Sequence, residues 1–124
     1  MILLVEDNLL NQRIVTFSLK KFNHEVVIAN NGVEAIQQFS EKKFDVVLMD
    51  IMMPVMDGLE ATTKIREFES KNNVAKRTPI IALTANTMDN DRDKCISYGM
   101  DEFMAKPFDI EKLNSIFSEL KIPS

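Results

Sequence analysis

The residues best equipped for chemistry are three acids, a hydroxyl and an ammonium group, each placed just after a short apolar segment. Glu6 and Asp7 follow the first such segment, and Asp50 follows the third. Thr84 follows the fourth, and Lys106 comes just after the fifth. Carboxylate oxygens bind hard cations, whereas a hydroxyl and an ammonium group donate hydrogen bonds to anions. Gathered at one place, these residues could hold a cation next to a phosphoryl group.

The three carboxylates need a cation between them if they lie together. Neighbouring strands are about 4.8 Å apart, so adjacent first and third strands would bring Glu6 and Asp7 close to Asp50. Each like-charge pair at about 4 Å then costs on the order of 4 kcal/mol at an effective dielectric of 20. Mg²⁺ takes one or two carboxylates and leaves room for a phosphate oxygen, so we predict Mg²⁺ here, with Mn²⁺ as a substitute. Neither His24 nor Cys95 has a spacing typical of a zinc site.

Each of these residues has a simpler explanation when taken alone. Acids before a helix, such as Glu6 and Asp7, can cap it, and Asp50 could cap a turn. Thr84 alone is more often bonded to local backbone, and a lone lysine is usually a solvated surface charge. Four separate segment ends that carry the parts of one site favour the functional interpretation.

The elements that must position these residues alternate regularly along the chain. Short apolar runs are typical of strands buried on both faces of a parallel sheet; they lie at Ile2–Val5, Val26–Ala29, Val46–Met49, Ile80–Leu83 and Glu102–Met104. Longer stretches with apolar residues at helical spacing lie between and after them, at Asn8–Phe22, Gly32–Lys42, Gly58–Glu69, Met88–Tyr98 and Ile110–Leu120. This pattern predicts an α/β fold, a doubly wound five-stranded parallel sheet with five helices, which binds ligands at the carboxyl ends of its strands.

The first helical stretch has two apolar stripes, although only one can face the sheet. One stripe contains Val15, Ser18, Leu19 and Phe22, and a smaller one, next to the acids, contains Leu10, Ile14 and Phe17. The smaller stripe is suited to packing against a helical partner. Burial against a neighbouring helix explains it about equally well.

Composition indicates a single domain over residues 1–124. The chain has 124 residues, 45% of them hydrophobic and 27% charged, which is near the commonest size of one domain. The net charge of −4 argues against direct nucleic-acid binding, which favours a basic surface. The apolar runs are far shorter than the roughly 20 residues that cross a bilayer. With one cysteine and no secretion signal, the chain is expected to be cytoplasmic and not inserted in a membrane.

Over essentially its whole length the sequence resembles the receiver domain of two-component response regulators. Four ordered motifs carry the resemblance, at Leu4–Asn8, Val47–Gly58, Ile81–Ala85 and Ala105–Phe108. The resemblance implies a flavodoxin-like receiver fold with strand order 2-1-3-4-5. That order puts the first and third strands side by side, as the cluster of acids requires.

The resemblance also assigns roles to the site residues. It implies that Asp50 is the nucleophile that takes a phosphoryl group and becomes an aspartyl phosphate. It implies that Glu6, Asp7 and Asp50 bind Mg²⁺, with the backbone carbonyl of Met52 as a further ligand.

Two more roles follow from the resemblance. Thr84 and Lys106 would stabilise the phosphoryl group during transfer and hold it afterwards. The family's conformational switch couples Thr84 to an aromatic residue three positions before the lysine, which here is Phe103. Because Phe103 has no hydroxyl group, we expect a switch based on packing, although a static place in the core explains this residue about equally well.

The same resemblance implies that the phosphoryl donor is a histidine kinase or a histidine phosphotransfer domain, and that the chain works in a phosphorelay. The stretches Asn8–Gln12 and Leu83–Asp101 are most similar to receivers of hybrid sensor kinases, so the chain is expected to be part of a larger hybrid kinase. Its output is expected to be by contact, as a monomer or weak dimer.

Three other functions use similar parts. A flavodoxin-like electron carrier shares the layered fold, but the adjacent acids Glu6 and Asp7 would repel the flavin phosphate. A Mg²⁺-dependent phosphatase with an aspartyl intermediate would have its acids two positions apart. A binding module independent of phosphorylation would not need the complete set of acids, hydroxyl and lysine. The chain is therefore expected to catalyse its own phosphorylation and dephosphorylation and to turn over no metabolic substrate.

Overall fold

The architecture of the chain is given by a computed structural model that describes residues 1–51, 57–72, 77–84, 93, 96–105 and 109–120. These residues include five strands and four helices. The strands are β1 (Ile2–Val5), β2 (Val26–Ala29), β3 (Val46–Asp50), β4 (Ile80–Thr84) and β5 (Glu102–Ala105). The helices are α1 (Leu9–Lys21), α2 (Gly32–Glu41), α3 (Gly58–Lys71) and α5 (Ile110–Glu119).

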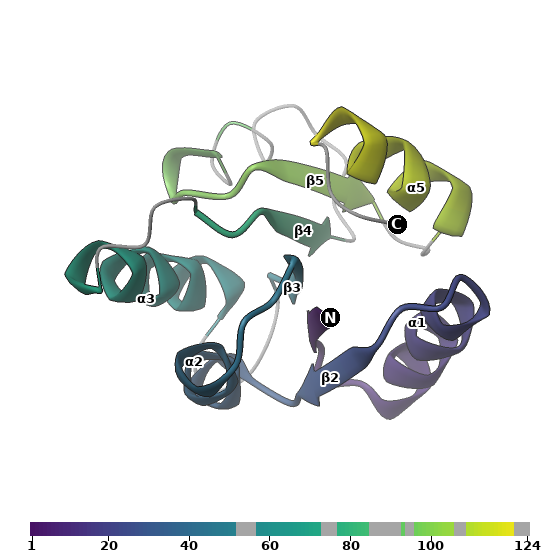
Figure 1. Ribbon diagram of the computed structural model, residues 1–124, viewed down its shortest axis with the longest axis horizontal. Helices are drawn as coiled ribbons and strands as arrows, with labels where there is room; N and C mark the ends of the chain where they lie inside the picture. The colour runs from purple at the N-terminus through teal and green to yellow at the C-terminus, as the bar shows by residue number, and fades with distance from the viewer. Residues whose placement is uncertain (52–56, 73–76, 85–92, 94–95, 106–108, 121–124) are drawn as a thin grey trace.

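The strands form one parallel sheet in the order β2-β1-β3-β4-β5. Helices α1 and α5 lie on one face of the sheet, and α2 and α3 lie on the other (Figure 1). The strand order reverses between β1 and β3, which is where a doubly wound sheet binds its ligands. The predicted fold class and strand order are therefore confirmed.

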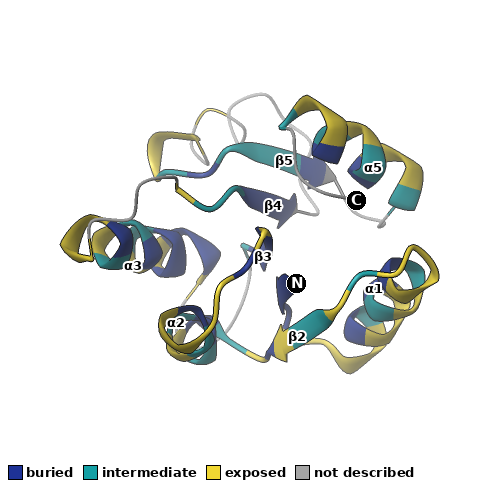
Figure 2. Cartoon of the chain, viewed as in Figure 1, coloured by how far each residue is buried: buried dark blue, intermediate teal, exposed yellow. Residues whose placement is uncertain are grey.

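Alternate residues of the central strands supply two apolar cores. Leu3 and Val5 belong to a cluster that includes residues of α2 and α3, whereas Ile2 and Leu4 belong to a cluster with residues of α1 and α5. Strands β1 and β3 are buried along their whole length, while the edge strand β2 is more exposed (Figure 2). Burial on both faces explains why the central strands are continuous apolar runs.

The helix ends follow from local side-chain chemistry. Each of the four helices starts after a capping residue whose side chain accepts a backbone N–H of the first turn; the caps are Asn8, Asn31, Asp57 and Asp109. Gly99 has a φ of 106°, which glycine adopts without strain. None of the helices in the described ranges is long and apolar enough to cross a membrane.

The predicted bounds of β1 and β2 are confirmed, and those of the other described elements differ from the observed ones by at most two residues. Strands β3, β4 and β5 each extend one residue further than predicted, so that Asp50 and Thr84 belong to the ladder rather than following it. The helix predicted at Met88–Tyr98 lies mostly outside the described residues. Within that stretch, Asp93, Ile96 and Ser97 are helical.

An arginine network, not foreseen from the sequence, joins α3 to the amino ends of β4 and β5. The guanidinium of Arg66 donates to the carboxylates of Glu69 and Asp101, each at 2.7 Å. It also donates to the backbone carbonyls of Gly99 at 2.9 Å and Thr78 at 2.8 Å. One largely buried cation thus satisfies four acceptors from separate parts of the chain.

The two acids of this network also bind backbone N–H groups at the start of β4. Glu69 accepts the backbone N–H of Thr78 at 2.6 Å, and Asp101 accepts that of Ile80 at 2.8 Å. Arg77 also pairs with Asp101 from the solvent side. The network therefore fixes where β4 begins relative to α3 and to the residue just before β5.

Replacement of Arg66 by alanine is expected to lower the free energy of unfolding by about 3–5 kcal/mol, because two mostly buried carboxylates lose their main cation. The measurement is urea denaturation followed by circular dichroism. Arg77→Ala is the matched control, since Arg77 is 54% exposed and shares Asp101; its loss should cost about 1 kcal/mol or less. Equal losses for the two variants would contradict the central role of Arg66.

Candidate metal centre

Three carboxylates meet at the carboxyl ends of β1 and β3. Val5 pairs with Met49 in the parallel ladder, so the residues that follow, Glu6 and Asp50, lie side by side. One oxygen from each carboxylate of Glu6, Asp7 and Asp50 lies within 4.8 Å of the other two. The acids therefore converge as expected from the sequence.

The cluster is buried on one side and open on the other. Glu6 is 1% exposed and Asp50 is 3% exposed, whereas Asp7 is exposed to solvent. Burial weakens the screening of like charges by water, so the mutual repulsion of these acids is stronger than it would be on a surface. A ligand can reach the cluster from the side of Asp7.

The Glu6 carboxylate is held in a fixed direction by the turn that follows β1. Its Oε2 atom accepts the backbone N–H of Asp7 at 3.1 Å and that of Asn8 at 3.5 Å. These two hydrogen bonds orient the Glu6 carboxyl group from the backbone of the turn.

The donor set suits a hard divalent cation such as Mg²⁺. The cluster found among the described residues consists of carboxylates only, and oxygen ligands are what Mg²⁺ prefers. His24, the one histidine, packs edge-on against Phe117 at the other end of the sheet, with 5.6 Å between ring centroids. Partial burial lowers the pKa of His24, and the ring lies away from the acid cluster.

Gly58 allows α3 to start against the backbone at the end of β3. A Cβ atom at this position would lie 2.4 Å from the carbonyl oxygen of Asp50 and 2.9 Å from the Cα of Ile51. The Gly58 N–H donates to the Ile51 carbonyl at 3.0 Å. A side chain here would push the end of β3 away, so the glycine is required by close approach.

Of the other predicted site residues, the structure describes Thr84 and Phe103. Leu83 pairs with Asp50, and Thr84, the next residue, pairs with Ala105 on β5. Met52 and Lys106 lie outside the described residues. Phe103 is partly buried against the core cluster on the α2 and α3 side, and its predicted role as a switch stays a prediction.

Two further residues support the cluster and were missed in the sequence. Gln12 is 6% exposed, and its side-chain N–H₂ group donates to the backbone carbonyl of Glu6 at 2.6 Å and to Asn30 Oδ1 at 2.8 Å. Helical spacing could have identified Gln12 as buried, because it lies on the same stripe of α1 as Val15 and Leu19. A polar residue on a buried stripe needs a hydrogen-bond partner.

The structure also decides which stripe of α1 faces the sheet. Val15 and Leu19 are buried, whereas Leu10 is 66%, Ile14 47% and Phe17 64% exposed. The smaller stripe is thus open to solvent near the acid cluster. Burial against a neighbouring helix does not explain it among the described residues.

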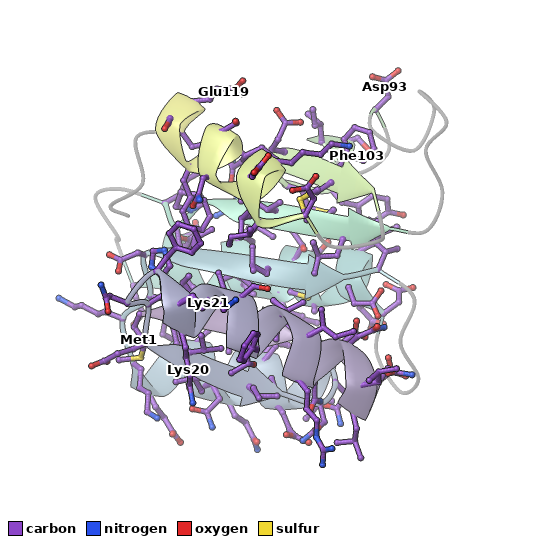
Figure 3. All side chains as sticks on the ribbon, turned by 90° about the vertical axis from the view of Figure 1, so that its right-hand side faces the viewer. Met1, Lys20, Lys21, Asp93, Phe103 and Glu119 are labelled. Atoms are coloured by element: carbon purple, nitrogen blue, oxygen red, sulfur yellow. The ribbon has the colours of Figure 1, made fainter. Side chains whose placement is uncertain are left out.

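Phe22 was expected on the buried stripe and is instead 46% exposed. The helix ends at Lys21, and Phe22 is the C-cap residue with non-helical backbone angles, so the helical spacing no longer applies to it. Lys20 and Lys21 lie at this end of α1, on the same side of the molecule as Met1 (Figure 3). The Lys21 ammonium lies 4.6 Å from the centroid of the exposed Phe17 ring.

Comparison with known sequences identifies related proteins. A family model described as response regulator receiver domain matches residues 2–118. Histidine kinase 5 of Arabidopsis thaliana is 39% identical over 95% of this chain, and hybrid signal transduction histidine kinase B of Dictyostelium discoideum is 46% identical over 86%. The chain spans only 15% and 6% of the lengths of these two relatives.

Two solved structures are similar over 95% of this chain. One is the co-crystal structure of the Saccharomyces cerevisiae histidine phosphotransfer protein Ypd1 with the receiver domain of the response regulator Ssk1; the match has a TM-score of 0.90, 32% identity and 86% coverage of that chain. The other is the receiver domain of the sensor histidine kinase PA1611 from Pseudomonas aeruginosa, with a magnesium ion coordinated in its active-site cleft; the match has a TM-score of 0.83, 39% identity and 93% coverage.

Replacement of Asp7 by asparagine is expected to raise the dissociation constant for Mg²⁺ about 10-fold or more, because one anionic oxygen of the cluster becomes neutral. Isothermal titration calorimetry with MgCl₂ provides the measurement. Asp57→Asn is the control, since Asp57 is an exposed acid outside the cluster and asparagine caps a helix equally well. Similar weakening in both variants would indicate a general charge effect and not a site.

Proposed function

The chain belongs to the response regulator receiver domain family, and on this premise we propose that Asp50 is its phosphoacceptor residue. The chain is a receiver domain of a phosphorelay, of the kind found in hybrid histidine kinases. The observation that carries the assignment is the convergence of Glu6, Asp7 and Asp50 within 4.8 Å at the switch point of the sheet. Of the three, Asp50 is the one held in the central strand β3.

The proposed reaction is transfer of a phosphoryl group from a phosphohistidine to Asp50. A carboxylate oxygen of Asp50 attacks the phosphorus atom, and an O–P bond forms while the N–P bond of the donor breaks. The imidazole leaves with the electron pair of that bond and takes a proton from solvent. Most of the catalysis in such a transfer is positioning and stabilisation of charge, which a small domain can supply with a few fixed side chains.

The surrounding residues stabilise the charge of the transferred group. Glu6, Asp7 and Asp50, together with the backbone carbonyl of Met52, would hold Mg²⁺, which would supply positive charge to stabilise the phosphoryl group. Lys106 and the hydroxyl of Thr84 donate hydrogen bonds to other phosphoryl oxygens in this proposal. A related receiver with magnesium in its active-site cleft supports the choice of metal, and Mn²⁺ is expected to substitute.

The donor is proposed to dock on the exposed apolar stripe of α1, which we define as Leu10, Ile14 and Phe17. These three side chains are between 47% and 66% exposed and lie on the helix that begins directly after the acid cluster. The similarity to a receiver crystallised with a histidine phosphotransfer protein supports a helical donor of this class. Apolar side chains that lose their water on contact are typical of the centre of such an interface.

The wider context is proposed from the relatives. The chain is proposed to be one domain of a larger hybrid kinase, cytoplasmic, and a monomer or weak dimer by itself. It catalyses its own phosphorylation and dephosphorylation and has no metabolic substrate. Its output is proposed to pass through Thr84 to the packing of Phe103 on β5, which lies beside β4 in the sheet.

Incubation with Mg²⁺ and acetyl phosphate is expected to add one phosphoryl mass, detectable by intact-protein mass spectrometry. Asp50→Asn should abolish the added mass, because an amide oxygen is a poor nucleophile for phosphorus. Removal of Mg²⁺ by a chelator should do the same. Asp57→Asn should be labelled like the wild type, and persistent labelling of the Asp50→Asn variant would contradict the assignment.

Replacement of Phe17 by aspartate is expected to slow phosphoryl transfer from phosphorylated Ypd1 about 10-fold or more, because it places a charge at the centre of the docking stripe. Labelling by acetyl phosphate, which needs no docking surface, should be unchanged. Val33→Asp on α2 is the matched control, since Val33 is 41% exposed on the other face of the sheet. Transfer from Ypd1 at the wild-type rate in Phe17→Asp would exclude Phe17 from the docking surface.

A further inference from the structure

Gln12 is a polar side chain on the buried face of an otherwise apolar stripe. It is 6% exposed, and the next residues on that stripe, Val15 and Leu19, are buried in the core cluster between α1, α5 and the sheet. Burying an amide costs free energy unless its hydrogen bonds are made. The amide of Gln12 makes them to Glu6 and Asn30, at the carboxyl ends of two neighbouring strands.

The Glu34 carboxylate, which binds Asn30, sets the donor and acceptor roles in these hydrogen bonds. Glu34 Oε1 accepts from Asn30 Nδ2 at 3.0 Å and from the Asn30 backbone N–H at 3.3 Å. Because a carboxylate can only accept, Asn30 must present its N–H₂ group to Glu34 and its Oδ1 to Gln12. The Gln12 side chain must then donate, which is what the carbonyl of Glu6 requires.

The hydrogen bond from Gln12 is one of several that hold the turn containing Glu6 and Asp7. The Glu6 N–H donates to the carbonyl of Ala29 on β2 at 3.0 Å, and the Glu6 carbonyl accepts from Gln12 at 2.6 Å. On the far side of the turn, Asn8 accepts the backbone N–H of Asn11 at 3.0 Å and so caps α1. With both polar backbone groups of Glu6 bound, the directions of the Glu6 and Asp7 side chains are fixed by the backbone.

We propose that Gln12 is a positioning residue for the Mg²⁺ site, acting by holding the backbone carbonyl of Glu6. This role rests on the proposed function of the site but is separate from the chemistry at Asp50. Residues behind the ligands of a metal site commonly change metal affinity about 10–100-fold when they are lost. The amide of Gln12 holds the peptide group between Glu6 and Asp7, and so helps to keep their carboxylates within 4.8 Å of that of Asp50.

The test compares Mg²⁺ binding by wild type, Gln12→Met and Thr16→Val, using calorimetry with MgCl₂ on protein shown to be folded by circular dichroism. Methionine has nearly the length of glutamine but cannot donate, so the dissociation constant should rise about 10-fold. Thr16 is the matched control: it lies one turn along α1, and its hydroxyl is buried with no hydrogen-bond partner among the described residues. Thr16→Val should bind Mg²⁺ like the wild type.

A second variant covers the case in which Gln12→Met does not fold. Asn30 is exposed, and Asn30→Ala removes the acceptor that orients Gln12 while leaving the core intact. It should weaken Mg²⁺ binding in the same direction but less than Gln12→Met. As an independent readout, the side-chain amide protons of Gln12 should exchange slowly with solvent in the wild type and faster in Asn30→Ala.

Unchanged Mg²⁺ affinity in the folded variants would overturn the positioning role of Gln12. So would equal weakening in Gln12→Met and Thr16→Val, since that result would indicate a general effect of altering α1. Neither result would affect the assignment of Asp50, which fails only if wild-type protein with Mg²⁺ takes no phosphoryl group at that residue. The two proposals are therefore separable by experiment.

Discussion

The candidate site depends on three carboxylates that the backbone holds close together. Glu6 and Asp50 end adjacent strands and are almost fully buried, so they cannot separate by turning into solvent as surface acids do. The Glu6 carboxylate is also bound to two backbone N–H groups. A site of this kind stores an unfavourable interaction that a divalent cation relieves, and the bound cation in turn attracts an anion. The proposed affinity for a phosphoryl group would follow from this arrangement of the acids.

Contacts from the helices hold the ends of β1 and β3 in place. Gly58 lets α3 begin against the backbone of Asp50, and Gln12 binds the carbonyl of Glu6 from α1. At the opposite end of the sheet, Arg66 and its acids fix the start of β4 and the approach to β5. The helix that carries the proposed docking stripe is therefore also the helix whose Gln12 binds the backbone of Glu6. Contacts at the two ends of the strands limit movement along the strand direction.

The elements of the fold were largely predictable, because their signals are local. Apolar runs of three or four residues located all five strands, and apolar residues at helical spacing located the four helices within the described residues to within two residues at each end. The errors are at the ends of elements. Asp50 was expected after its strand, but pairing with β4 extends the ladder through it. The prediction that Phe22 is buried was wrong for a similar reason. Phe22 is the C-cap of α1, where the helical spacing behind the prediction ends.

By itself the sequence determined which residues could do the chemistry and that they follow successive strands, because residue type and period are properties of the chain alone. It also determined that α1 has two apolar stripes, of which only one can face the sheet. Only the tertiary structure decided which stripe is covered, that Gln12 and Asn30 support Glu6, and that Arg66 reaches four partners. These contacts join residues up to 35 positions apart. Their geometry depends on strand order and register, which no local pattern contains.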